Sequence, residues 1–367
     1  MQPIHRQAVL LFLIASAALA AQQPAAQPSA PPTAQPTTAA EAPNRDTSYI
    51  DAQGSVHVAR VVPLPRTISP QAQLFLSPQV PDQAPPQSLE ERRRTTDEST
   101  ARTGAAWSRL CPNTMVEDKI AGVPVRIFTP EGLPEGNRDK VLINLHGGGF
   151  NSDSGSYAES IPIASFTKIK VVSVMYRLAP EHPFPAGVDD AIAVYKELLK
   201  TYKPRHIVIY GTSAGAIITG EVAAKLKQLG MPMPAALGIF SALADFARAG
   251  DTASLYTSRG FAGHLDPPGP EPHDPYYIGG IDPTDPVLSP IYGDLHDMPP
   301  TLFVSSTRDM LLSGTSNLHR AYLRAGVDAR LVVFDGLPHA FWYNPALPES
   351  QEASHLMADF FVKELDK

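Results

Sequence analysis

The chain of 367 residues is long enough for two domains, or for one large α/β unit with additions, at about 100–200 residues per domain. Hydrophobic residues make up 43% of it, enough for a core, and its net charge of −7 argues against nucleic acid as a partner, because phosphate binding needs a basic face. The single cysteine, Cys111, excludes an intrachain disulfide framework and a Cys-based zinc site. We expect it to be a small buried apolar residue.

Residues 1–20 have the three parts of a secretory signal peptide. Arg6 supplies positive charge, an uncharged apolar run covers residues 8–20, and Ala18-Leu19-Ala20 matches a small-x-small cleavage site. A membrane anchor is the alternative, but the run is shorter than the roughly 20 residues that span a bilayer. We therefore expect export to the periplasm or the extracellular space, with no integral membrane span after removal of the signal.

Residues 21–47 are mostly Ala, Pro, Gln and Thr with almost no large apolar side chain, and proline stays frequent through Pro86. Such a segment buries too little surface to offset its ordering entropy, which predicts a disordered tether over residues 21–67. The folded domain is expected to cover residues 68–367. A helix should begin after Ser88, which forms a capping box with Glu91. The arginines at 92–94 indicate a solvated face of this helix.

The next segments predict an α/β fold with a mainly parallel sheet and helices on both faces. Two strand-like runs around Ala121-Gly122 indicate a β-hairpin. Tightly bounded apolar runs, typical of strands buried on both faces, then alternate with helical patterns. The runs are 141–145, 171–174, 207–210, 302–304 and 331–334, and the helical patterns are 188–200, 214–229, 313–325 and 349–365. Residues 246–282, rich in Gly and Pro, indicate an irregular insertion beside a site.

Two glycine-containing motifs indicate acyl-transfer chemistry. Residues 211–215 (GTSAG) follow a strand-like run and precede a helix, the context of a nucleophile elbow that would expose Ser213. Residues 146–150 (HGGGF) follow the strand VLINL, where glycines let backbone N–H groups approach a developing oxyanion. His146 is expected to orient this loop.

A serine nucleophile needs a base and an orienting carboxylate, expected downstream in the order Ser, acid, His. His339 follows the strand-like run LVVF and Asp309 follows LFVSS, so both lie where α/β sheets place their chemistry. Asp335 is the rival carboxylate, but it stands only four residues before His339 and is expected to stabilise a turn. The other downstream histidines are His264, His273, His296, His319 and His355.

The chain resembles the hormone-sensitive-lipase-like esterases, the bacterial family IV carboxylesterases of the α/β-hydrolase fold. The resemblance rests on ordered blocks: HGGGF at 146–150, YRLAPEHPFPA at 176–186, GTSAG at 211–215 and DPVLSP at 285–290. It covers about residues 68–365. We expect the 176–186 segment to be a rigid loop that braces the glycine motif, with the spacing of Arg177 and Glu181 suggesting a pair.

The resemblance implies Ser213 as nucleophile, Asp309 as acid and His339 as base. It also implies an oxyanion hole at the backbone N–H groups of Gly148, Gly149 and Ala214, with Gly147 shaping the loop. Two departures from the family pattern are visible. The acid motif lacks its second acid, since Ser313 stands there, and the usual His-Gly-Phe reads His339-Ala340-Phe341. The family's cap is expected from about residues 68–110 and 246–282.

These features predict a serine carboxylesterase that acts on short- to medium-chain acyl esters and uses no metal or organic cofactor. Its expected partner is a small ester. Because the nucleophile chemistry is shared, an amidase, an arylformamidase or a lactonase on the same scaffold is the alternative. A non-catalytic ligand-binding homologue, as among plant gibberellin receptors, is the alternative from another class. It is disfavoured because Ser213, Asp309 and His339 are all present.

Overall fold

The structure, a computed structural model, describes residues 47–77, 88–261 and 275–367. The chain divides into two units, residues 1–62 and 63–367. In the first unit, β1 (Tyr49–Ile50) and β2 (Val56–His57) pair antiparallel, within the segment expected to be a tether. The expected signal peptide lies outside the described residues. Among the described helices, none has the length and hydrophobicity to span a membrane.

The second unit contains an eight-stranded sheet in the order β10-β9-β8-β7-β5-β6-β4-β3. The strands from β10 to β6 run parallel, whereas β4 and β3 are antiparallel additions at one edge. The predicted, mainly parallel sheet is therefore confirmed. The strands are β3 (Asn113–Ile120), β4 (Val123–Pro130), β5 (Val141–Leu145), β6 (Lys170–Val174), β7 (Ile207–Thr212), β8 (Ala236–Phe240), β9 (Thr301–Arg308) and β10 (Ala329–Pro338).

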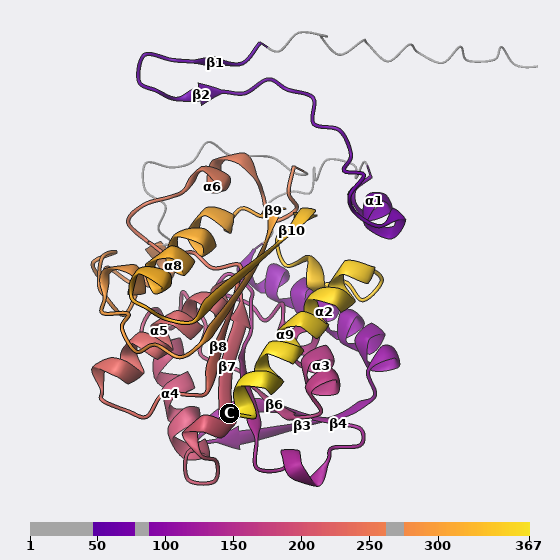
Figure 1. Ribbon diagram of the computed structural model, residues 1–367, viewed down its shortest axis with the longest axis vertical. Helices are drawn as coiled ribbons and strands as arrows, with labels where there is room; N and C mark the ends of the chain where they lie inside the picture. The colour runs from indigo at the N-terminus through magenta and orange to yellow at the C-terminus, as the bar shows by residue number, and fades with distance from the viewer. Residues whose placement is uncertain (1–46, 78–87, 262–274) are drawn as a thin grey trace, which may run out of the picture. The chain divides into compact units, whose positions relative to one another are not determined.

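Helices cover both faces of this sheet (Figure 1). They are α1 (Pro70–Leu76), α2 (Leu89–Leu110), α3 (Ser156–Thr167), α4 (Ala186–Leu198), α5 (Ala214–Gln228), α6 (Asp251–Leu255), α7 (Pro275–Ile278), α8 (Leu312–Arg324) and α9 (Pro348–Leu365). Helices α4, α5 and α8 share one core with the sheet, whereas α2, α3 and α9 share the other. Consecutive side chains of β7 alternate between these cores: Ile207 and Ile209 lie in the first, Val208 and Tyr210 in the second. This alternation explains why the strand is apolar throughout.

Most elements lie where the sequence patterns predicted them, often extended by a few residues. The predicted hairpin is β3–β4, closed by Ala121 and Gly122, both with positive φ. The predicted capping box of α2 is also confirmed, because Ser88 and Glu91 exchange side chain–backbone hydrogen bonds. The helix α3, which contains Pro162, and the short strand β8 were not predicted. Neither were the small elements β1, β2, α1, α6 and α7. Cys111 is buried as expected, and burial raises the pKa of its thiol.

Candidate active site

The Ser213 elbow joins β7 to α5 at the carboxyl edge of the sheet. Ser213 adopts φ 58° and ψ −124°, a conformation rare for a residue with a side chain and typical of a strained functional turn. Its glycine neighbours are required by close packing. A Cβ on Gly211 would lie 2.2 Å from the Leu145 carbonyl oxygen, and one on Gly215 would lie 1.8 Å from it. The end of β5 therefore presses directly against the elbow.

The glycine loop that follows β5 lies beside this elbow. Gly148 and Gly149 have φ values of 132° and 58°, and a Cβ on Gly148 would lie 1.9 Å from the Ser152 carbonyl oxygen. Within the described chain, the backbone N–H groups of Gly148 and Gly149 have no protein acceptor, and Ala214, the first residue of α5, has no intrahelical one. Unpaired donors of this kind can bind an anion.

Asp309 and His339 lie together at the carboxyl ends of β9 and β10. The Asp309 Oδ1 and the His339 Nδ1 are 2.9 Å apart, and Asp309 is fully buried. The rival Asp335 accepts hydrogen bonds from the Thr67 and Thr307 hydroxyls instead. The Ser213 hydroxyl makes no hydrogen bond to any described residue. The structure thus brings the predicted acid and base into contact and leaves the serine hydroxyl unpaired.

Two serines that sequence reasoning missed hold the Asp309 carboxylate. Ser241 and Ser305 both donate their hydroxyls to Oδ2, Ser305 at 2.8 Å, while the Leu311 N–H donates to Oδ1 at 2.9 Å. Burial alone would raise the pKa of Asp309, but the charge and hydrogen bond of His339, with the other donors, hold it below its ordinary value. The carboxylate is therefore kept ionised and fixed in orientation against the imidazole.

A second buried carboxylate, Glu159 on α3, connects the glycine loop to the segment after His339. Its Oε1 accepts hydrogen bonds from the Gly147 N–H, at 3.0 Å, and from the Tyr343 hydroxyl. Its Oε2 accepts one from the Asn144 amide at 2.7 Å. Because Gly147 donates to Glu159, its N–H is not available to an oxyanion. Burial raises the pKa of Glu159 to about 7 against these three hydrogen bonds. Sequence reasoning missed this residue.

The prediction that the arginines of α2 form a solvated face is wrong for Arg93, whose guanidinium contacts other parts of the protein. Its guanidinium donates to the Asn151 carbonyl at 2.7 Å, to the Ala179 carbonyl at 3.0 Å, and to both oxygens of Glu181 at 2.7 Å. Arg93 thus clamps the chain just after the glycine motif to the 176–186 loop. Such a partner, more than 50 residues away in sequence, cannot be recognised from the charge pattern alone.

The 176–186 loop braces the glycine motif, although not through the expected pair. Tyr176 donates its hydroxyl to the His146 carbonyl at 2.7 Å, and the Ala179 N–H donates to the Phe150 carbonyl at 2.9 Å. Arg177 pairs with Asp190 at 2.9 Å rather than with Glu181. The His146 ring is buried and stacks on Tyr176 with their centroids 4.3 Å apart, consistent with the expected orienting role.

The two departures from the family pattern have structural counterparts. Ala340 adopts φ 52° and ψ 33°, the left-handed region that glycine adopts without strain. Ser313, which replaces the second acid, exchanges hydrogen bonds of 3.0–3.2 Å with Thr252 of α6. The acid loop is therefore anchored to the 246–282 insertion by neutral hydroxyls.

The same insertion contacts the glycine loop through aromatic rings. Tyr277 of α7 stacks on Phe150 with a centroid separation of 3.5 Å, and its hydroxyl donates to the buried Glu221 of α5 at 2.5 Å. Burial raises the pKa of Glu221 well above its ordinary value. Among the described residues, no group of three or more His, Cys, Asp or Glu side chains is arranged to hold a metal ion.

Comparisons with known proteins agree with this architecture. The model of the alpha/beta hydrolase fold family matches residues 142–343. An acetyl-hydrolase of Streptomyces hygroscopicus is 33% identical over 246 residues, which cover 65% of this chain and 81% of the relative. An esterase of Acinetobacter venetianus is 29% identical over 245 residues, which cover 65% and 80%.

Two solved structures have the same overall arrangement. The crystal structure of an esterase E25 superposes with a TM-score of 0.73 at 31% identity, covering 83% of this chain and 97% of that one. An esterase from the bacterial hormone-sensitive lipase family superposes with a TM-score of 0.65 at 28% identity, covering 81% and 99%. The chain therefore belongs to the alpha/beta hydrolase fold family, among the bacterial hormone-sensitive-lipase-like esterases, and is a carboxylic ester hydrolase.

Proposed function

We propose that the enzyme hydrolyses short- to medium-chain acyl esters through Ser213, His339 and Asp309. The observation that carries this proposal is the 2.9 Å contact between Asp309 and His339, beside a strained serine elbow. The alternative acid, Asp335, is satisfied by threonine hydroxyls. The unpaired N–H groups of Gly148, Gly149 and Ala214 support an oxyanion hole at these residues.

The reaction proceeds in two steps. His339 takes the proton of Ser213 as its oxygen attacks the ester carbonyl, and then gives this proton to the leaving alcohol. Asp309 holds the imidazole in the required tautomer and stabilises its charged form. The oxyanion is stabilised by the unpaired N–H groups, each of which is typically worth about 10²–10³ in rate. Water, activated by His339, then releases the acid from Ser213.

The expected acyl preference is supported by the relatives. The Streptomyces relative is named an acetyl-hydrolase, and a solved relative was soaked with p-nitrophenyl butyrate. We infer that acetyl to medium-length acyl groups fit this enzyme as well, and that palmitate esters are poor substrates.

A hydrolysis panel on purified protein tests the proposal. It compares p-nitrophenyl esters from acetate to palmitate with matching anilides. Ser213→Ala should abolish nearly all turnover, since triad members act as a unit, whereas Ser108→Ala on the exposed surface of α2 should not. Full activity of Ser213→Ala would contradict the assignment. Turnover of the anilides alone would favour an amidase, and silence on all substrates would favour a ligand-binding role.

We also propose that residues 1–20 direct export and are then removed. The support is the sequence pattern alone: a charged start, an apolar run and the Ala18-Leu19-Ala20 site. Sequencing the amino terminus of the exported protein tests this proposal. A terminus at Ala21 is expected, and an uncleaved chain in the cytoplasm would contradict it.

A further inference from the structure

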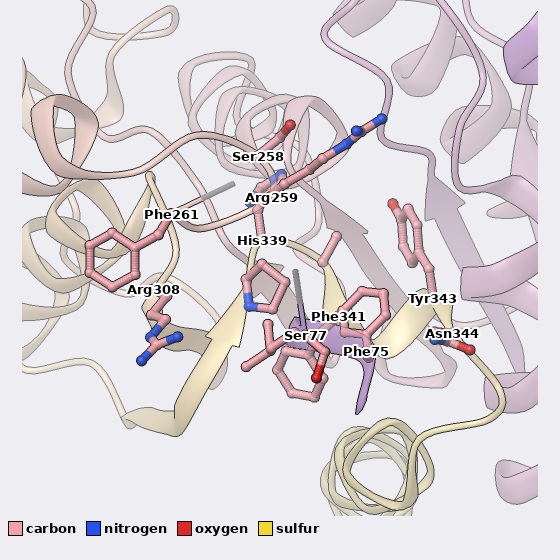
Figure 2. Close-up of a pocket in the computed structure, with 13 residues that line it drawn as sticks. Phe75, Ser77, Ser258, Arg259, Phe261, Arg308, His339, Phe341, Tyr343 and Asn344 are labelled. Atoms are coloured by element: carbon pink, nitrogen blue, oxygen red, sulfur yellow. The ribbon is translucent and has the colours of Figure 1, made fainter. Parts of the chain in front are cut away.

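A cavity of about 530 Å³ opens beside His339, a volume within the usual range for small-molecule sites. Both expected cap segments contribute to it: Phe75 from the end of α1, and Arg259 and Phe261 from the insertion. Figure 2 shows Arg308 and Phe261 together on one side of the His339 ring. Among the thirteen described lining residues there are two arginines and no Asp or Glu. The described lining thus combines aromatic rings with two guanidinium groups, in an enzyme whose net charge is negative.

The position of the cavity suits the alcohol part of an ester. Its lining includes His339 but neither Ser213 nor the glycines of the oxyanion loop. In serine hydrolysis the histidine protonates the oxygen of the leaving alcohol. A group attached to that oxygen therefore extends past the imidazole, toward the residues that surround His339.

Of the two arginines that line the cavity, Arg259 and Arg308, Arg308 is the better placed to bind a ligand. It directly precedes Asp309 at the end of β9, so its backbone is fixed by the sheet. Its guanidinium lies 4.9 Å from the centroid of the Phe261 ring, and one N–H donates to the Pro63 carbonyl at 3.2 Å. The remaining guanidinium N–H groups have no acceptor among the described residues. A half-buried guanidinium with unused donors in a fork geometry is suited to bind a carboxylate.

Asp335 does not neutralise this charge by an ion pair. The hydrogen bond from the Thr67 hydroxyl is the largest cause that holds the pKa of Asp335 below its ordinary value, and burial acts against it. Thr307 lowers the pKa further by its hydrogen bond, whereas Arg308 lowers it by charge alone. Both carboxylate oxygens of Asp335 accept threonine hydroxyls. Within the described chain, Arg308 therefore keeps its charge available to a ligand in the cavity.

We propose that Arg308 is a specificity-determining residue that binds an anionic group on the alcohol part of the substrate. The favoured substrates are then esters whose leaving alcohol carries a carboxylate or a similar anion, such as acylated hydroxy acids. This inference rests on the proposed function, because it uses His339 as the group that protonates the leaving alcohol.

The test compares 4-acetoxybenzoate with its neutral methyl ester. The two substrates share the acetyl group and differ in the charge on the leaving phenol. The readout is the ratio of kcat/KM for the anionic and the neutral substrate. Arg308→Gln should lower this ratio about tenfold, the effect expected when a hydrogen bond to a charged group is lost. Arg308→Lys should retain part of it. Arg330→Gln, the same change at an exposed position outside the cavity, should leave the ratio unchanged.

Wild-type inhibition provides a measurement that does not depend on a variant. During hydrolysis of p-nitrophenyl acetate, 4-hydroxybenzoate should inhibit at lower concentration than the neutral 4-hydroxybenzamide, and added salt should reduce the difference. An unchanged ratio in Arg308→Gln, or equal inhibition by both phenols, would overturn the inference. Absence of Ser213-dependent turnover of p-nitrophenyl acetate would instead contradict the proposed function, so the two failures are distinguishable.

Discussion

Replacing Glu159 by glutamine should change how the stability of the enzyme depends on pH. Glu159 is fully buried in the protein interior, and burial raises its pKa from an ordinary 4.5 to about 7. Between these two values the folded protein keeps a proton that the unfolded chain has lost. Because the folded state then binds more protons, stability falls as the pH rises through this window and is constant above it.

The magnitude follows from the pKa difference. A pKa that rises from 4.5 to about 7 corresponds to about 3 kcal/mol, at about 1.4 kcal/mol per pKa unit. The groups that face Glu159 include some that lower its pKa and some that raise it. Asn144, Gly147 and Tyr343 donate hydrogen bonds that favour the ionised form, whereas burial and the neighbouring Asp153 carboxylate oppose it. Glutamine cannot ionise, so it removes the whole pH-dependent contribution.

Urea denaturation of both proteins at several pH values between 4.5 and 8 measures this effect. The free energy of unfolding of the wild type, minus that of Glu159→Gln, should fall by about 3 kcal/mol across the series. Taking the difference cancels groups common to both proteins, such as Glu221. Glu352→Gln makes the same chemical change on the exposed surface of α9 and serves as the control. A difference that stays constant with pH would refute the reasoning.

Two further predictions concern the proposed catalytic acid and the clamp on the glycine loop. Asp309→Asn should lower kcat for p-nitrophenyl acetate by about 10³–10⁴, and Asp335→Asn by less than about tenfold; the reverse ranking would make Asp335 the acid. Arg93→Ala should lower the free energy of unfolding by about 1–3 kcal/mol, because it leaves backbone carbonyls unpaired, whereas Glu181→Gln, at a half-exposed partner, should cost less. Thermal and urea denaturation measure the stability of the two variants. Equal losses in Arg93→Ala and Glu181→Gln would show that the ion pair with Glu181, and not the contacts with the carbonyls, accounts for the stabilisation by Arg93.

The sequence predicted the strands that are apolar on both faces, because β5 and β7 lie in the middle of the sheet and need apolar side chains throughout. It did not predict β8, whose pattern ALGIF is short and contains Gly238. A Cβ there would lie 2.7 Å from Phe361 and from Tyr210, so close packing by α9 and β7 selects the glycine that weakens the strand pattern. The helix α3 was missed because its small residues and Pro162 give little helical periodicity.

The motifs around Ser213 and His339 stand out in the sequence because the proposed chemistry requires particular residue types at fixed spacing. The residues that position them were not. Ser241 and Ser305 lie at a strand end and inside a strand, where serine carries no signal of its own. Glu159 offered a weak signal, as the one acid in the otherwise uncharged sequence of α3, and Arg93 resembled any solvated arginine. Their roles depend on contacts between segments distant in the chain.

The contact between His339 and Asp309 depends on an irregularity in β10. Phe334 pairs with Ser306, but Pro338 pairs with Arg308, so four residue steps on β10 match two on β9. In regular pairing, Leu337 would stand opposite Asp309 and His339 would lie beyond it. The two extra residues bring His339 level with Asp309 instead.

Asp335 and Gly336 form this irregularity. Gly336 has φ 70°, its N–H donates to the Thr307 hydroxyl at 2.7 Å, and that hydroxyl in turn donates to Asp335 at 3.0 Å. Extra residues in a strand re-aim the side chains that follow. The rival carboxylate thus acts on the site through backbone geometry rather than through the imidazole. Any loss of activity in Asp335→Asn should therefore appear with a displaced His339 and not with a changed histidine tautomer.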